Sequence, residues 1–321
     1  MYTKMNTSLM KENVKMSSTW GQSAWKYMFP SETTRSAFYS IFTKNSSYNS
    51  FYNWLVGVVD GHGCFYFGRT KKDNWTFCFK VSQSKYNLRL LYFIKSGLKV
   101  GSINISENGC AEYCIRNTDH ILKVILPIFN KYPLLTSKQY SYEKFRDSLV
   151  IYQDKILSKE QKDEIICKIQ YSAISDNYQS YVWQNITEND LTISQVHSIM
   201  SKEWLIGFTE AEGSFYFVKK GPTRIAHCFE ITQKKDKIVL VAISLILDMK
   251  VVAKKDYYAC LTTNRKSIDR VIDYFFGTMK GMKSLEYRIW SRSYRKSTTF
   301  EDLVKVQTMI RNIRNNYKMK V

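Results

Sequence analysis

The sequence contains one stretch twice: Trp54-Leu55-Val56-Gly57-Val58-Val59-Asp60-Gly61-His62-Gly63-Cys64-Phe65-Tyr66-Phe67 and, 150 positions later, Trp204-Leu205-Ile206-Gly207-Phe208-Thr209-Glu210-Ala211-Glu212-Gly213-Ser214-Phe215-Tyr216-Phe217. The register continues without a gap to Cys78-Phe79-Lys80-Val81-Ser82-Gln83, which matches Cys228-Phe229-Glu230-Ile231-Thr232-Gln233. Ten of the thirty positions from Trp54 to Gln83 are identical to their partners. A repeat of this length predicts two copies of a small domain, related by a pseudo-two-fold axis, rather than a solenoid.

Composition favours a nucleic-acid partner. The 321 residues suffice for two ordinary domains. Lys and Arg number 48 against 28 Asp and Glu, a formal net charge of +20, which favours a polyanionic partner over a charge that serves solubility alone. The longest apolar run, residues 238–247, is about half as long as a membrane-spanning helix, so we expect a buried helix and no membrane.

Cysteine and codon usage indicate the compartment. None of the seven cysteines forms a Cys-x-x-Cys pair and the four histidines lie far apart, so the pattern does not predict zinc. An odd count in a long chain is typical of free thiols in a reducing compartment. Abundant Lys, Asn, Ile, Tyr and Phe have AT-rich codons, which suggests an AT-rich genome such as that of an organelle.

Hydrophobic periodicity predicts the same element order in each copy. In the first copy we expect a helix over residues 54–61, ended by Gly63 in the left-handed conformation, a first strand from Cys64, and a second strand over 76–82. A helix over 86–96, strands over 102–105 and 112–116, and helices over 120–129 and 140–152 follow. Each copy thus reads α-β-β-α-β-β-α.

We divide the chain into five segments. Residues 1–50 are a loosely ordered N-terminal extension or, since acids are scarce, a transit peptide. Residues 51–157 form the first half, 158–200 a linker and 201–300 the second half. The linker opens with a predicted helix, because Ser158-Lys159-Glu160-Gln161 matches a capping box, and is polar over 172–195. Residues 301–321 form a basic C-terminal helix.

Small residues in the repeated motif predict a helix interface. Gly57 and Gly61 are four apart, as are Gly207 and Ala211, so each pair lies on one helix face. Small residues at this spacing let two backbones approach closely, and we expect the two motif helices to pack together at the centre. The alternative is that the glycines relieve local crowding within each half.

Such packing brings the two helix ends together. His62 and Glu212 occupy equivalent positions at the helix C-termini, where the backbone dipole is negative and attracts cations. Carboxylate oxygen there would hold Mg²⁺, and metals at such a junction activate water for phosphodiester hydrolysis. Asp60 and Glu210 lie two residues earlier and point elsewhere, to cap the partner helix or to hold the interface.

Over residues 51–295 the chain resembles the LAGLIDADG family, which comprises intron-encoded homing endonucleases and RNA maturases. Beyond the motifs, Ser137-Lys138-Gln139-Tyr140-Ser141-Tyr142 pairs with Met282-Lys283-Ser284-Leu285-Glu286-Tyr287. The stretch 125–133 is similar to members that serve as both endonuclease and maturase. The resemblance implies an α+β fold of two pseudo-symmetric α-β-β-α-β-β-α halves, whose curved antiparallel sheets form a DNA-binding saddle over the major groove. Together with the AT-rich codons, it also implies a mitochondrial location.

The resemblance also implies residue roles. Glu212 matches a catalytic metal ligand for Mg²⁺, Gln83 and Gln233 match glutamines that order water, and Lys138 and Lys283 match lysines near the scissile phosphates. The family carries an acid where this chain has His62. A neutral imidazole adds no charge and is a poor ligand for Mg²⁺, so the resemblance implies nicking, slowed cleavage or loss of cleavage.

Basic residues on or beside the predicted strands are candidates for nucleic-acid contact. They are Arg69, Lys71, Lys72, Lys80 and Lys85 in the first half and Lys219, Lys220, Arg224, Lys234 and Lys235 in the second. We expect a monomeric Mg²⁺-dependent endonuclease on a long, pseudo-palindromic double-stranded DNA site. The alternatives are a non-enzymatic maturase that binds its host group I intron RNA, and a DNA-binding regulator on the same scaffold.

Overall fold

The computed structural model describes residues 48–296 and 299–316. Most of the predicted extension, residues 1–47, and the end of the predicted C-terminal helix, residues 317–321, lie outside the described residues. No helix among the described residues is both long and apolar enough to cross a membrane.

The first half begins with a helix over residues 48–62, which contains the first motif. A four-stranded antiparallel sheet follows, in the order β1-β2-β4-β3. Its strands are β1 Gly63–Arg69, β2 Trp75–Ser84, β3 Ser102–Ile105 and β4 Cys110–Ile115, with α4 Leu88–Leu98 between β2 and β3. The predicted strand over 102–105 matches β3 at both ends.

The helices that close the first half are α5 Thr118–His120, a π-helical turn η2 over Ile121–Ile125, α6 Leu126–Lys131 and α7 Lys138–Gln153. Sequence periodicity predicted one helix over 120–129, whereas the structure has three successive segments. The π turn precedes Pro127, which cannot donate a backbone hydrogen bond.

The connection between the halves is packed rather than extended. It contains α8 Lys159–Tyr171, the 3₁₀ turn η3 Tyr181–Trp183 and α9 Ile193–Ile199. The predicted capping box at Ser158 is present: its side chain accepts from the backbone N–H of Gln161, and the Gln161 side chain accepts in return. Trp183 is 1% exposed and donates Nε1–H to the carbonyl of Leu135. Although the connection is polar in composition, the buried side chain of Trp183 anchors it to the first half.

The second half repeats the first. It contains α10 Lys202–Glu212, β5 Ser214–Lys219, β6 Ile225–Gln233, α11 Lys237–Leu247, β7 Lys250–Ala253, β8 Tyr258–Thr262, α12 Arg265–Phe275, α13 Lys283–Lys296 and α14 Phe300–Asn316. Its sheet has the order β5-β6-β8-β7, which matches the first sheet strand for strand. The predicted α+β class, with two pseudo-symmetric halves and two antiparallel sheets, is confirmed.

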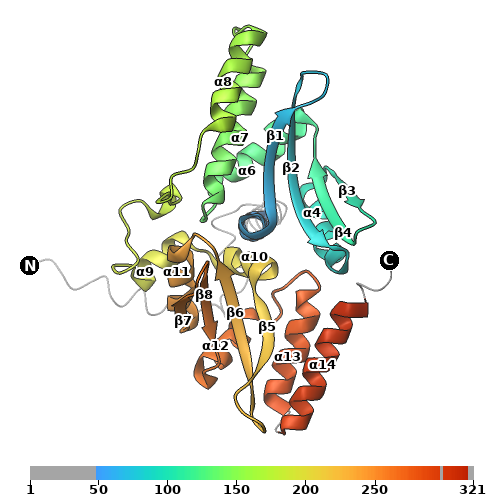
Figure 1. Cartoon of the computed structure of the whole chain (residues 1–321), viewed down its shortest axis with the longest axis vertical. Helices are drawn as coiled ribbons and strands as arrows, with labels where there is room; N and C mark the ends of the chain where they lie inside the picture. The colour runs from blue at the N-terminus through green and yellow to red at the C-terminus, as the bar shows by residue number, and fades with distance from the viewer. Residues whose placement is uncertain (1–47, 297–298, 317–321) are drawn as a thin grey trace, which may run out of the picture. The chain divides into compact units, whose positions relative to one another are not determined.

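Each sheet has one covered and one open face, as strand alternation requires. Phe65 and Phe79 are buried beneath α6 and α7, with Phe65 in ring contact with Phe145. On the opposite face of β1, Cys64 and Tyr66 are exposed. Figure 1 shows the helices α12 and α13 beside β5 and β6 in the second half. The open faces are the surfaces left for a large partner.

Gly63 has a different role from the predicted one. Positive backbone φ angles among the described glycines occur at Gly101, Gly109 and Gly277, so Gly63 does not end its helix in the left-handed conformation. Instead it begins β1, where an added Cβ would lie 2.3 Å from Val59 Cγ1 and 2.7 Å from the Val59 carbonyl oxygen. Gly63 is therefore required by close packing where the helix turns into the strand.

Candidate functional site

The two motif helices cross in backbone contact. A Cβ added to Gly57 would lie 2.0 Å from the carbonyl oxygen of Trp204, and one added to Gly207 would lie 2.0 Å from that of Trp54. Such distances leave room only for hydrogen atoms. Towards the helix ends, a Cβ on Gly61 would lie 2.3 Å from Ala211 Cβ. The four small residues singled out by the sequence thus meet along one seam.

The seam places His62 opposite Glu212. Each is the last residue of its motif helix, and His62 Nε2 lies 3.8 Å from Glu212 Oε1. The Glu212 side chain is about a quarter exposed, at the edge of a cavity of about 710 Å³ that Gln83 and Lys283 also line. One carboxylate and one imidazole therefore face each other where the two halves meet.

Two lysines cover the C-terminal ends of the motif helices. Lys138 Nζ donates to the carbonyls of Gly61 and Gly63, both at 2.8 Å. Lys283 Nζ donates to the carbonyls of Thr209, Ala211 and Gly213. The ammonium groups bind carbonyls at and just beyond the helix ends, one of which, that of Thr209, also accepts from the backbone N–H of Gly213, and they offset the negative ends of the helix dipoles. Sequence reasoning placed these lysines near the site but missed this capping role.

Carboxylates of the motifs hold the loops that precede the two lysines. Asp60, 3% exposed, accepts from the backbone N–H groups of Leu135 and Thr136. Glu210, 1% exposed, accepts from the backbone N–H groups of Lys280 and Gly281. Since Lys138 and Lys283 follow these loops directly, each motif carboxylate positions the lysine that caps its own helix.

Polar residues from the opposite half hold the same loops. Asp236, just before α11, accepts from the backbone N–H and the hydroxyl of Ser137. Asn87, just before α4, accepts from the backbone N–H of Met282 at 2.8 Å. Each lysine-bearing loop is therefore clamped by both halves, and the position of each lysine depends on how the halves are packed.

A chain of side-chain hydrogen bonds sets the tautomer of His62. Because Asn87 Oδ1 accepts from Met282, its amide nitrogen donates to Gln83 Oε1, at 3.1 Å. The Gln83 amide nitrogen is then directed at His62 Nδ1, at 2.7 Å, and can only donate to it. A neutral His62 therefore carries its proton on Nε2, on the side facing Glu212, where it offers a hydrogen-bond donor and no free lone pair.

Burial and the lysines tune the charges of this centre. Burial, followed by the positive charges of Lys283 and Lys138, lowers the pKa of His62 to about 4, so the imidazole is neutral at pH 7. Burial raises the pKa of Glu212, and the same two lysines oppose that rise. Burial also lowers the pKa of Lys283 to about 8 and lowers that of Lys138.

The donor set fits one Mg²⁺ ion better than two. No three His, Cys, Asp or Glu side chains cluster closely enough to hold a metal among the residues described. Mg²⁺ commonly keeps several waters and takes one or two carboxylates plus substrate phosphates, which a site at Glu212 would allow. His62 directs a proton, not a lone pair, at the same place. The chain thus supplies one anionic oxygen ligand where two motif acids would supply two.

The other candidate residues are arranged unequally. Gln233 ends β6 and is half-buried, but unlike Gln83 its side chain makes no hydrogen bond within the described part of the chain. Arg69 and Lys219, equivalent residues at the ends of β1 and β5, lie on the covered side of their sheets: Arg69 pairs with Asp163 of α8, and Lys219 lies over Phe300 of α14. These two basic residues do not reach the open faces.

The remaining basic candidates are better placed for an external partner. Lys80 lies within β2 on the open face, 3.7 Å from Glu112 and over the ring of Tyr66. The others occupy turns or strand ends and are exposed or half-buried: Lys71, Lys72, Lys85, Lys220, Arg224, Lys234 and Lys235. These candidates thus lie around the edges of the open faces.

Sequence comparison identifies relatives along most of the chain. A family model described as LAGLIDADG endonuclease matches residues 55–149 and 205–294. The probable intron-encoded endonuclease Cox1-I1b of Schizosaccharomyces pombe is 38% identical over 282 residues, which cover 84% of this chain and 70% of that protein. The uncharacterized mitochondrial protein RF1 of Saccharomyces cerevisiae is 30% identical over 195 residues, 60% of this chain and 38% of that protein.

Solved structures share the fold. The meganuclease I-SmaMI bound to an uncleaved DNA target with calcium ions superposes with a TM-score of 0.64 and 22% identity, over 83% of this chain and 97% of that one. I-SmaMI bound to cleaved DNA gives a TM-score of 0.65 and 23% identity, over 83% and 95%. At these identities the likeness establishes the architecture of two halves.

Proposed function

We propose, from the premise that this chain belongs to the LAGLIDADG endonuclease family, that it is an intron-encoded, site-specific DNA endonuclease with a weakened or strand-selective centre. The observation that carries the proposal is the seam itself. It brings one acid, Glu212, together with two capping lysines where the motif helices of the two halves are in contact.

DNA is the partner that fits the open faces. The two sheets are equivalent and follow each other across a pseudo-two-fold axis, so a long duplex with a pseudo-palindromic sequence matches their spacing. Lys80 on the open face and the basic turns contact phosphates, while neighbouring strand residues reach base edges in the major groove. The I-SmaMI structures with DNA support this proposal. Both motif helices come from one chain, so a monomer suffices.

The residues at the seam have different roles in hydrolysis. Glu212 would hold Mg²⁺, which would supply Lewis-acid chemistry at a phosphoryl oxygen and lower the pKa of water. Lys138 and Lys283 hold positive charge close to the scissile phosphates and stabilise charge that develops in the transition state. Gln83 keeps His62 oriented, and His62 donates a hydrogen bond towards Glu212 or water. Because only one half supplies an acid, we expect one strand to be cut faster than the other.

A test requires a duplex that spans the insertion site of the host intron, incubated with and without Mg²⁺ and with each strand labelled separately. We expect Mg²⁺-dependent cleavage that favours one strand. Glu212→Gln should abolish cleavage while a gel shift shows unchanged DNA binding. The matched control is Glu107→Gln, since Glu107 lines the same cavity but is exposed and distant in sequence from the motifs. Cleavage that survives Glu212→Gln would refute the assignment.

A second candidate function is favoured by His62. A protein that binds the RNA of its host group I intron without cutting DNA does not require a second motif acid. A basic surface also suits the phosphates and the shape of RNA. Under this alternative the wild-type chain would leave the DNA intact with Mg²⁺ yet assist splicing of its intron in vitro. The two candidates are separated by assaying both activities on one preparation.

The location we propose is mitochondrial. RF1 is described as a mitochondrial protein, and AT-rich codon usage in this chain agrees with an organellar gene. The chain spans 70% of the length of Cox1-I1b and 38% of that of RF1. Fractionation of the host cell would test the location.

A further inference from the structure

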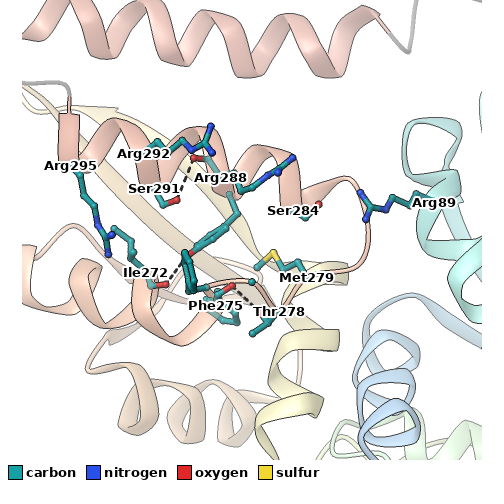
Figure 2. Close-up of a pocket in the computed structure, with 13 residues that line it drawn as sticks. Arg89, Ile272, Phe275, Thr278, Met279, Ser284, Arg288, Ser291, Arg292 and Arg295 are labelled. Atoms are coloured by element: carbon teal, nitrogen blue, oxygen red, sulfur yellow. Dashed lines mark hydrogen bonds between the residues drawn. The ribbon is translucent and has the colours of Figure 1, made fainter. Parts of the chain in front are cut away.

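A second cavity, of about 510 Å³, shares no residue with the cavity at Glu212. Four arginines line it: Arg288, Arg292 and Arg295 along α13, and Arg89 from α4 of the first half. Figure 2 shows Arg89 at one end of the pocket and Arg295 near the other, with Arg288 and Arg292 between them. No lining residue is acidic.

The floor of this arginine pocket is apolar and ordered. Phe275 and Met279 are buried in it, and Tyr287 is fixed there because its hydroxyl donates to the carbonyl of Ile272. At the rim, Phe276 is 74% exposed. It directly precedes Gly277, whose φ of +69° ends the α12 segment and turns the chain away. An exposed aromatic residue and the arginines thus line the same pocket, which has an apolar floor.

Most of the positive charge in the pocket is uncompensated. Arg295 lies 3.6 Å from Asp273, an exposed pair of little strength. Arg89, Arg288 and Arg292 make no ion pair with any residue the structure describes. Three guanidinium groups therefore remain available to an anion that could approach from solvent.

The pocket lies on the other side of the sheet from the proposed duplex. Trp290 of α13 packs against Phe215, with ring centroids 5.1 Å apart, and donates Nε1–H to the carbonyl of Tyr216. Helix α13 therefore covers one face of the second sheet, while its arginines are exposed on the helix surface away from that sheet. A ligand in the pocket would leave the open sheet face uncovered.

We infer that the arginine pocket binds unpaired nucleotides of a single-stranded nucleic acid. Guanidinium groups in a row suit successive phosphates, and an exposed aromatic ring beside an apolar floor suits an unstacked base. A duplex keeps its bases stacked inside and would leave the floor empty. A lone phosphate would use neither the floor nor Phe276. RNA and DNA single strands share this chemistry, and the experiment distinguishes them.

The test measures fluorescence anisotropy of the full chain with labelled strands of about 12 nucleotides, a usual site size. The strands are an RNA, a DNA of the same sequence, and a DNA in which the bases are replaced by abasic sites. We expect the strands with bases to bind roughly tenfold more tightly than the abasic strand. Tighter binding of RNA than DNA would identify RNA as the ligand, and equal binding would identify any unpaired strand.

Variants separate the pocket from general attraction to a basic protein. Arg288→Glu with Arg292→Glu should weaken binding roughly tenfold or more and flatten its salt dependence. Phe276→Ala should weaken binding roughly fivefold or more for strands with bases and leave the abasic strand unaffected. The matched control is Lys123→Glu with Lys155→Glu, which makes the same charge change at two exposed lysines outside the pocket.

Two results would overturn the inference: an abasic strand that binds as tightly as the others, or a control double variant that loses as much affinity as the pocket variant. All the substituted side chains are exposed, and matching thermal melts would show that the variants fold. The inference is independent of the nuclease proposal, because the pocket variants should cut duplex DNA at the wild-type rate. Absence of nuclease activity would leave the binding result unchanged.

Discussion

At the scale of single residues, His62 changes the chemistry of the centre more than any other difference between the two motifs. A carboxylate there would accept the hydrogen bond from Gln83 with one oxygen and direct the other towards the seam. The imidazole accepts from Gln83 on Nδ1 and directs a proton towards Glu212. Compared with a carboxylate, His62 therefore presents a neutral hydrogen-bond donor to Glu212 instead of an anionic acceptor. It still accepts the hydrogen bond from Gln83.

His62→Asp should therefore raise Mg²⁺-dependent cleavage about tenfold or more, equivalent to ~1.4 kcal/mol of transition-state stabilisation. The new carboxylate supplies an oxygen ligand and keeps Gln83 as its donor. The measurement is the strand-specific cleavage rate on the insertion-site duplex, with His197→Asp on the exposed surface of α9 as the control. An unchanged rate would contradict the role given to this position.

The buried His227 makes the stability of the fold depend on pH. It is 7% exposed, its ring nitrogen Nε2 pairs with Ser293 Oγ, and burial lowers its pKa to about 4. Between pH 6.5 and 4, the His227 imidazole is protonated in the unfolded chain and neutral in the folded chain. The free energy of unfolding therefore falls as the pH falls.

His227→Phe should remove this part of the acid sensitivity, because the equivalent residue in the first half is Phe77. Between pH 7 and pH 4, the wild-type chain should lose about 2 to 3 kcal/mol more unfolding free energy than the variant does. Urea unfolding at the two pH values measures this difference. Equal losses would show that the imidazole is not held neutral by burial.

At the scale of elements, backbone contact between the motif helices is what joins the halves. Gly57 and Gly207 each face a carbonyl oxygen of the other helix, so neither position can accept a side chain unless the helices separate. The close crossing is also what brings Glu212 within 3.8 Å of His62. The packing of the motif helices therefore also sets the distance between His62 and Glu212.

Gly57→Ala should destabilise the fold by more than about 4 kcal/mol, since its Cβ would overlap the Trp204 carbonyl. Gly221→Ala is the matched control: nothing lies within 4 Å of its added Cβ, and we expect a change within about 0.5 kcal/mol. Chemical unfolding of both variants at one pH gives the comparison. A mild effect of Gly57→Ala would mean that the helices are not in backbone contact.

At the scale of the whole molecule, Asp60 connects three parts of the chain. Its two oxygens accept from Thr136 and Leu135 in the loop before Lys138, and from Trp204 Nε1 in the second motif helix. It therefore holds a lysine loop of its own half and a helix of the other half with one carboxylate. Burial nonetheless raises its pKa to about 6.

Asp60→Asn should cost about 2 to 4 kcal/mol of unfolding free energy and also disturb the seam. Both carboxylate oxygens accept N–H donors, so an amide nitrogen in either orientation would face a donor and leave it unpaired. Asp176→Asn, at an exposed position in the connection, is the control. Wild-type stability of Asp60→Asn would show that these bonds contribute little.

The sequence by itself determined the division into two halves, the order of their elements and the meeting of the two motif helices. These features follow from local patterns: a repeat in constant register, strand alternation as in residues 102–105, and small residues four apart. It also indicated that Asp60 and Glu210 point away from the pair formed by His62 and Glu212, because residues two apart on a helix face different directions.

Only the tertiary structure decided what the side chains do at the seam. That Lys138 and Lys283 cap the motif helices, that Asn87 reaches Met282, and that Arg69 and Lys219 lie on the covered faces depends on contacts between distant segments. The bond from Met282 to Asn87 spans 195 positions in the chain. Hydrogen-bond direction, and with it the tautomer of His62, is set by the packing of two halves, which no local pattern encodes.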